Sequence, residues 1–175
     1  MSALLVLVIA AVWAFAATAW PALPAQIPTH FDAGGRPDAW AAPGFASWFL
    51  LPTLATGMVA LMGLGLPRWI VGMARRNSAL LNMPQKARFQ ALAEAARVRA
   101  VAAAAVGLRR VALLVAALFG WILYGTNEVA HGRWDGLPPA GLFGAVGLLV
   151  AQSLWLLVAA SRAVSREVAA AGDGG

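Results

Sequence analysis

Residues 20–40 read WPALPAQIPTHFDAGGRPDAW, and this polar stretch separates the first two apolar runs of the chain. Its four prolines predict an extended entry into the loop, because proline and the residue before it both avoid helical angles. The Asp-Ala-Gly-Gly sequence at 32–35 predicts a tight turn, in which glycine supplies positive backbone angles. We therefore predict a rigid loop that joins two apolar segments and returns the chain through Trp40.

The composition explains what those segments are. Hydrophobic residues make up 61% of the 175 residues and charged residues only 11%, whereas soluble domains carry roughly 25% charged residues. Four apolar runs alternate with polar segments, as membrane-spanning helices require, because hydrocarbon offers the backbone no hydrogen-bond partner. The sequence predicts an all-α membrane protein with four transmembrane helices in an antiparallel bundle. The absence of cysteine excludes disulfides and thiolate chemistry.

The chain is expected to form one integral membrane domain, residues 1–175, with spans at 3–20, 45–66, 108–126 and 140–161. An outer loop 21–44, a cytoplasmic segment 67–107, an outer loop 127–139 and a cytoplasmic tail 162–175 connect and follow them. Ala17-Thr18-Ala19 resembles a signal-peptide cleavage site, but no basic residue precedes it, so we expect a retained helix. Pro52 should lie in the first turns of the second span, and Pro67 should end it.

The distribution of positive charge predicts the orientation. Nine of the 13 lysines and arginines lie between the second and third spans, while the loops after spans one and three hold only Arg36 and Arg133. Loops rich in lysine and arginine remain in the cytoplasm. Both termini should therefore lie on the cytoplasmic side of a bacterial cytoplasmic membrane, and residues 21–44 should lie on its outer side. The basic residues cluster between spans, which favours lipid headgroups rather than nucleic acid as their partner.

The basic segment has its own pattern. Asn82-Met83-Pro84-Gln85 predicts a turn followed by a helix start, and an alanine-rich helix is expected from Gln85 to Gly107. This helix either runs along or out of the membrane into span three, or presents an amphipathic surface to a partner.

Two further groups of residues are assigned from their position in the spans. Small residues recur four apart at 112, 116 and 120, at 140 and 144, and at 147 and 151, and such rows should let helices approach closely. Tryptophan and arginine at the ends of spans should lie at the membrane interface. The packing positions are Ala116, Gly120, Gly144 and Gly147, and the interface positions are Trp20, Trp48, Trp69, Arg75, Arg76, Arg109 and Arg110.

The candidate chemistry is sparse. No charged residue lies well inside a span, which argues against transporters and intramembrane enzymes. His30 and His131 lie in different outer loops, and although two imidazoles with nearby carboxylates would suit zinc or copper, their spacing matches no metal motif. Ser47 is the only serine near the outer face. We therefore predict no catalytic residue, no metal and no cofactor.

Residues 20–40 also carry a resemblance. The pattern Trp-Pro-x-Leu-Pro-x-x-Ile-Pro-Thr-His-Phe-x-x-x-Gly-x-Pro-Asp-x-Trp resembles the signature of a bacterial membrane-domain family of unknown function. That domain also forms the N-terminal part of SdpI-like proteins, which give immunity to a secreted toxin and take part in its signalling. Residues 82–86 resemble a second family element, so the likeness covers roughly residues 12–120. By resemblance, the recognition loop comprises Pro24, Pro28, His30, Phe31, Gly35, Asp38 and Trp40.

Two hypotheses follow from this sequence. The first is a non-enzymatic multi-pass membrane protein whose outward loop recognises an extracellular peptide or envelope component, in an immunity-like or signalling-like role. The alternative is a structural or accessory subunit that packs into a larger membrane complex through its small-residue faces.

Overall fold

A computed structural model describes residues 1–76, 78–83 and 85–172. The described residues group into two compact units. Unit 1 comprises Met1–Val59 and Ala112–Leu149, and unit 2 comprises Ala60–Val111 and Val150–Gly175. The boundaries fall inside long helices, so each unit is built from segments far apart in the sequence.

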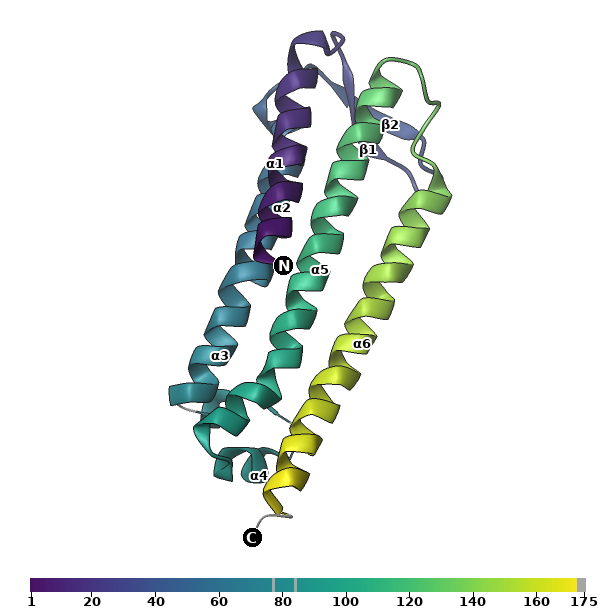
Figure 1. Cartoon of the computed structure of the whole chain (residues 1–175). Helices are drawn as coiled ribbons and strands as arrows, with labels where there is room; N and C mark the ends of the chain where they lie inside the picture. Colours follow the sequence, from purple (N-terminus) through teal and green to yellow (C-terminus); the bar gives the residue numbers. More distant parts are fainter. Residues whose placement is uncertain (77, 84, 173–175) are drawn as a thin grey trace. The chain divides into compact units, whose positions relative to one another are not determined.

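The elements follow one another along the chain as drawn in Figure 1. The N-terminal part comprises α1 (Ser2–Ala19), the 3₁₀ turn η1 (Trp20–Ala22), β1 (Ile27–Phe31) and β2 (Pro37–Ala41). A helix in four segments follows, η2 (Phe45–Phe49), α2 (Leu50–Met58), η3 (Val59–Gly65) and α3 (Leu66–Arg76). The remaining elements are η4 (Ser78–Leu80), α4 (Lys86–Ala91), α5 (Glu94–Ala130) and α6 (Pro139–Gly172).

Four helices are long and apolar enough to cross a membrane: Ser2–Ala22, Phe45–Arg76, Glu94–Ala130 and Pro139–Gly172. Each contains one of the four apolar runs of the sequence. The prediction of a mostly helical, multi-pass membrane protein is therefore confirmed at this level.

The all-α prediction is wrong for the first loop, which contains a two-stranded antiparallel sheet. Ile27 of β1 pairs with Ala41 of β2, and the register is irregular between Pro28 and Phe31. The predicted turn is confirmed: Gly35 has a φ of 80°, and the Asp32 carboxylate accepts hydrogen bonds from the backbone N–H groups of Gly34 and Arg36, both at 2.8 Å. The strands escaped prediction because Pro28 and Pro37 weaken a strand pattern, although a two-stranded hairpin consists of edges and tolerates proline there.

The second long helix does not end at Pro67 as predicted but continues to Arg76. Pro67 is the second residue of α3, which begins at Leu66 directly after the π-helical segment η3. Proline is costly in an α-helix because its ring clashes with the carbonyl four residues earlier. The wider π turn before Pro67 relieves that clash, so the helix continues through it.

The helix expected from Gln85 to Gly107 is interrupted. Helix α4 ends at Ala91, Leu92 is extended with a ψ of 148°, and α5 begins at Glu94. The expected helix start at Pro84 lies outside the described residues, and Gln85 has a φ of 51°.

The core of unit 1 forms around Trp48. This residue was predicted at the membrane interface but is only 1% exposed, and it packs with Val12, Ala16, Ile27 and Leu123. Its Nε1 donates a hydrogen bond to the Ala16 carbonyl at 2.9 Å. A buried indole needs such a partner, and Ala16 offers one because its small side chain leaves the α1 backbone accessible.

A second contact joins α1 and α2 in the same unit. Trp13 Nε1 donates to Thr56 Oγ1 at 2.9 Å, and Thr56 donates to the Pro52 carbonyl at 2.8 Å. Pro52 lies in the third position of α2, in the first turns of the span as predicted.

Unit 2 has a separate core that includes Ala74, Phe89, Val101 and Val164. Arg97 supports it from α5, where Nε donates to the Ala74 carbonyl at 2.8 Å and Nη1 donates to the Leu92 carbonyl at 2.7 Å. Those bonds satisfy one carbonyl near the C-terminal end of α3 and one at the break before α5. One arginine therefore holds both of these segments in place.

The four predicted packing positions divide into two pairs. Ala116 is fully buried, and a Cβ built on Gly120 would lie 2.9 Å from a Val12 methyl group, so α1 and α5 approach closely there. The structure differs at Gly144 and Gly147, where a Cβ would meet no atom within 4 Å. No other helix of the described chain therefore packs closely against those two glycines.

The remaining predicted interface residues lie mostly at the surface. Trp20 and Trp69 are exposed, and Arg75 and Arg76 are exposed in the last turn of α3. Arg109 is partly buried, and Arg110 is exposed beside a tryptophan of α6.

Replacing Trp48 tests the core of unit 1. Trp48→Ala should lower the free energy of unfolding by about 3 kcal/mol or more, because it removes a buried aromatic side chain. Trp48→Phe keeps most of the volume and should cost about 1 kcal/mol for the lost hydrogen bond. The measurement is denaturant unfolding in mixed micelles. Trp69→Ala is the control, since Trp69 is 53% exposed; an equal loss in both alanine variants would contradict the buried role.

Candidate functional site

The hairpin brings together two residues that the sequence singled out separately. His30 lies in β1 and Asp38 in β2, and His30 Nδ1 lies 2.5 Å from Asp38 Oδ1. The two side chains are 68% and 48% exposed, so the pair faces solvent rather than the core. When the imidazole is protonated this contact is a charge-assisted hydrogen bond, which is shorter and stronger than a neutral one.

Trp40 adds an exposed aromatic ring to the same strand. It lies two residues after Asp38 and is 45% exposed, whereas Ile27 and Pro28 of β1 are fully buried. All three central residues of β2, from Asp38 to Trp40, are exposed. We call His30, Asp38 and Trp40 the hairpin surface.

The other predicted recognition residues have less exposed positions. Pro28 and Gly35 are buried, and Pro24 and Phe31 are half-buried. The structure thus divides the predicted set into three residues that face solvent and four that lie partly or fully inside unit 1.

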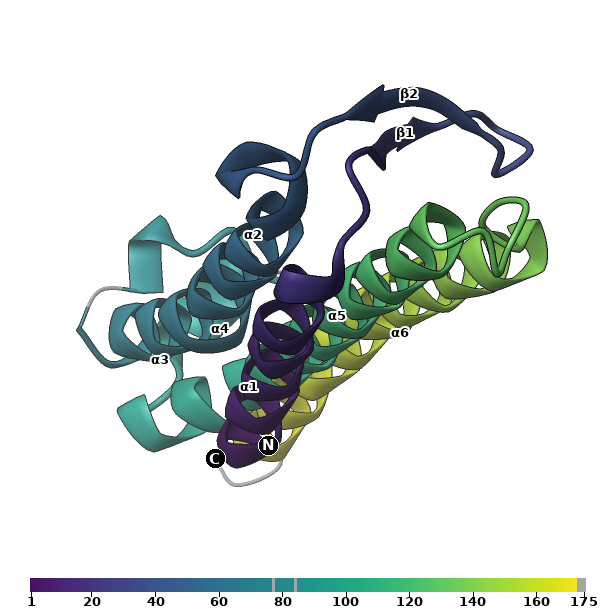
Figure 2. The ribbon, with the colours of Figure 1, turned by 90° about the horizontal axis from the view of Figure 1, so that it is seen from above.

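The tip of the hairpin is attached to the loop between α5 and α6. The Leu137 N–H donates to the Gly35 carbonyl at 2.7 Å, and Gly35 is buried with a φ of 80°. A Cβ on Gly35 would collide with the Leu137 carbonyl oxygen, and one on Gly136 would collide with the Gly35 carbonyl oxygen. Figure 2 shows the hairpin turn beside this loop. Glycine is needed at both positions because the two backbones touch.

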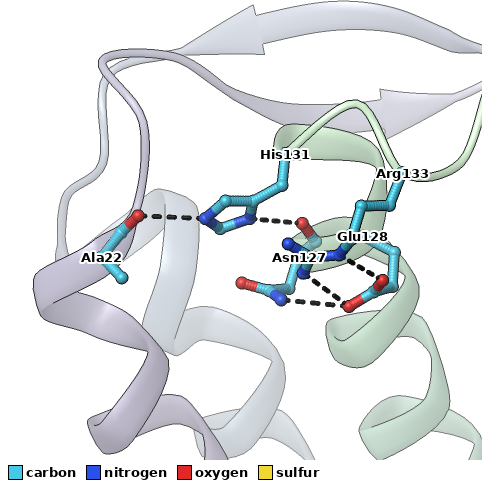
Figure 3. A network of polar contacts seen from close by, with 5 residues as sticks. All are labelled: Ala22, Asn127, Glu128, His131 and Arg133. Carbon is cyan, nitrogen blue, oxygen red and sulfur yellow. Dashed lines mark hydrogen bonds and ion pairs between the residues drawn. The ribbon is translucent and has the colours of Figure 1, made fainter.

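His131 makes a second attachment, shown in Figure 3. Its Nε2 lies 3.0 Å from the Ala22 carbonyl oxygen, at the entry to the hairpin, and its Nδ1 lies 2.8 Å from the Asn127 carbonyl oxygen. Both partners only accept hydrogen bonds, and a neutral imidazole donates from one nitrogen, so only the protonated ring donates to both. The ring therefore joins the end of α1 to the end of α5.

Glu128 and Arg133 close the end of α5 in the same view. Arg133 Nε donates to Glu128 Oε2 at 2.6 Å and Nη2 donates to Oε1 at 2.7 Å, in a bidentate pair. The hydrogen bonds that Arg133 donates to this carboxylate raise the pKa of its guanidinium above the ordinary value. A carboxylate near a helix C-terminus is unfavourable, and the guanidinium offsets that cost while it holds the loop against the helix.

A cavity of about 260 Å³ lies under the hairpin, between β1, the start of the second long helix and α5. Its lining includes Phe31, Leu51 and Leu123 with the hydroxyls of Thr29, Ser47 and Thr126. Sites for drug-sized ligands enclose about 300–1,000 Å³. The cavity is smaller than that range.

The described residues contain no group of three or more histidine, cysteine, aspartate or glutamate side chains placed to hold a metal ion. Ser47 is engaged locally: its Oγ donates to the Ala42 carbonyl at 2.9 Å and accepts from the Gly44 N–H at 2.8 Å.

Sequence reasoning missed the hairpin pairing and the Glu128–Arg133 pair. A signal for the hairpin was present, because two five-residue extended segments flank a glycine-containing turn. The Glu128–Arg133 contact had no comparable signal, since it depends on the helix ending at Ala130 and on Gly132 taking a φ of 68°.

Gly35→Ala should detach the hairpin tip from the α5–α6 loop, because the new methyl group would collide with the Leu137 carbonyl. Amide hydrogen exchange should become faster in residues 32–41 and at Leu137. Gly132→Ala is the matched control: Gly132 also has a positive φ, but a Cβ there meets no atom within 4 Å. It should cost only about 1 kcal/mol of backbone strain, and equal exchange in both variants would show that the contact does not hold the tip.

Comparison with known proteins adds one finding. A family model described as a domain of unknown function (DUF1648) matches residues 7–56, which span most of α1, the whole hairpin and the start of the second long helix. No curated protein and no solved structure matches the chain. The chain is thus a multi-pass membrane protein by its four long apolar helices, and its residues 7–56 are similar to this domain family of unknown function.

Proposed function

We propose that this protein is a non-enzymatic membrane receptor whose hairpin surface recognises an extracellular peptide or envelope component. The observation that supports this most is the exposed His30–Asp38 pair beside Trp40, on a hairpin fixed by buried contacts. Anchoring comes from Ile27 in the core of unit 1, from the Gly35–Leu137 hydrogen bond and from the His131–Ala22 contact. A rigid binding surface loses little conformational entropy when its ligand binds.

A peptide has a specific way to bind this surface. The described sheet has two strands, so each strand has one edge without a strand neighbour. An extended peptide can add to such an edge, with main-chain hydrogen bonds giving affinity and side-chain contacts giving specificity. Strand β2 is the better edge because its three central residues are exposed. The His30–Asp38 pair would then contact polar groups of the peptide, and Trp40 would cover an apolar one.

The charge distribution supports an outward hairpin. Nine of 13 lysines and arginines lie between the second and third spans, and the positive-inside rule assigns that segment to the cytoplasm. The proposal therefore places both termini on the cytoplasmic side of a bacterial inner membrane. Successive spans then cross the membrane in opposite directions. The resemblance of residues 20–40 to SdpI-like proteins favours an immunity or signalling role.

An accessory-subunit role is the second candidate, and helix α6 favours it. In the most apolar stretch of this helix no residue is buried by the described chain. Gly144 and Gly147 are open there, and small residues on a free helix face suit close packing of another membrane helix. Purification in mild detergent separates the two functions: a stoichiometric set of membrane proteins that co-elutes would favour the subunit.

The orientation is tested by labelling single cysteines, since the natural chain contains none. Ala33→Cys in the hairpin turn should react with an impermeant maleimide in intact cells, and Ala87→Cys in α4 should react only after lysis. Both positions are exposed, so burial does not prevent either reaction. The reverse labelling pattern would contradict the outward hairpin.

The recognition role is tested by a photoreactive residue placed at Ala39, between the hairpin-surface residues of β2. In intact cells it should crosslink to an extracellular peptide or envelope component. Both His30→Ala and Asp38→Ala should lower the yield about tenfold, because each removes a charge-assisted hydrogen bond. Asp135→Ala is the control, an exposed acid in the other loop. Unchanged yields in the first two variants, at equal membrane abundance, would disprove recognition by this surface.

A further inference from the structure

Helix α6 and Ala103 of α5 line an open groove of about 620 Å³ in unit 2. The lining changes character along α6, from an apolar part to a cationic part. The apolar part consists of Trp155, Val158 and Ala159, and the polar part consists of Ser161, Arg162, Ser165 and Arg166. The groove is therefore amphiphilic, with its two parts in order along the helix.

The positions match the depth of a membrane interface. An α-helix rises 1.5 Å per residue, so Arg162 and Arg166 lie roughly 10 and 16 Å beyond Trp155 along α6. The apolar run 140–160 has the length of about 20 residues that the hydrocarbon core requires. Trp155 thus lies just inside the hydrocarbon edge, and the two arginines lie at the level of the lipid headgroups.

The cationic part of the groove is available to an anion. Three ion pairs occur in the described chain, and neither Arg162 nor Arg166 takes part in one. The neighbouring carboxylate of Glu167 is already bound, because Arg99 Nη2 donates to its Oε2 at 2.8 Å and Arg99 Nε donates to its Oε1 at 3.1 Å. The two guanidinium groups therefore remain to face a bound anion. Ser161 and Ser165 lie beside them in the lining, and Ser165 Oγ accepts a hydrogen bond from Gln85 Nε2 at 3.2 Å, which leaves its O–H to donate.

The apolar part is fixed by neighbouring contacts. The Arg110 guanidinium lies 4.6 Å from the centre of the Trp155 ring, in a cation–π contact. One turn earlier in α5, a Cβ on Gly107 would collide with the Leu156 side chain, so the two helices are in close contact there. The groove therefore has a fixed floor along the apolar part rather than a loose gap between helices.

We propose that this groove binds one anionic phospholipid, with its phosphate at Arg162 and Arg166 and an acyl chain along Trp155 and Val158. Charge complementarity identifies the head of the ligand as an anion, and the apolar part requires a hydrocarbon chain attached to that head. A phospholipid has both groups at the required separation and is present wherever this chain spans a membrane. Free phosphate would leave the apolar part uncovered. This site lies in unit 2 and does not depend on the hairpin.

Native mass spectrometry of the full chain in mild detergent, titrated with phosphatidylglycerol, tests the proposal. The unmodified protein should bind a first lipid more tightly than later ones. Arg162→Gln with Arg166→Gln should weaken that first event roughly 25-fold, at about fivefold for each cation near an anionic lipid. Arg75→Gln with Arg76→Gln is the matched control, because it removes the same charge from exposed positions of the same unit. This control should leave the first event unchanged.

A second variant keeps both arginines. Val158→Trp should fill the groove and also weaken the first event, and a folded product is expected because Val158 is 47% exposed. Three outcomes would overturn the proposal: equal weakening in the control pair, equally tight binding of phosphatidylcholine, or displacement of the lipid by inorganic phosphate at equal concentration. The first would indicate diffuse surface attraction, the second a purely apolar groove, and the third a site for free phosphate.

Discussion

The fold depends on one constraint, which is that a backbone surrounded by hydrocarbon must satisfy its own hydrogen bonds. All four apolar runs respond by forming helices. The constraint also explains the second long helix, which contains two prolines that remove backbone donors. Thr53 and Thr56 donate their hydroxyls to the carbonyls of Phe49 and Pro52, both at 2.8 Å. Pro52 lies in the first turn of α2 and Pro67 in the first turn of α3, directly after the π-helical segment η3, and the helix continues past both.

Outside the apolar runs, strand pairing and a side chain satisfy backbone hydrogen bonds in place of a helix. Residues 27–41 pair as two strands, and the turn between them is closed by the Asp32 carboxylate. The tip then uses the Gly35 carbonyl to bind the Leu137 N–H. Each backbone group that is satisfied inside the protein also fixes the position of the hairpin. The hydrogen bonds between the strands, in the turn and at the tip therefore hold the hairpin in place, while the outer edge of each strand has no strand neighbour.

The carboxylates of the described residues differ in the side chain that pairs with them. The two buried or partly buried carboxylates, Glu128 and Glu167, are each held by an arginine. The exposed carboxylate of Asp38 is held by a histidine instead, whose charge depends on protonation. Arginines in excess of these pairs lie mostly in unit 2, and two of them line the groove proposed to bind a phospholipid. The two proposed binding surfaces thus differ in chemistry as well as in position: one offers a histidine, a carboxylate and an indole, and the other offers paired arginines above an apolar floor.

The sequence by itself determined the four apolar helices and the turn at 32–35, because segment length, composition and glycine conformation are local properties. It also predicted close helix packing at Ala116 and Gly120, but not that α1 is the helix that packs against Gly120. Only the tertiary structure decided which side chains meet: the burial of Trp48, the contact of His30 with Asp38 and the approach of Gly35 to Leu137. His30 and Asp38 lie 8 positions apart in the sequence, and Gly35 and Leu137 lie 102 positions apart. A local pattern does not encode such pairings, since they depend on strand register and on where α5 ends.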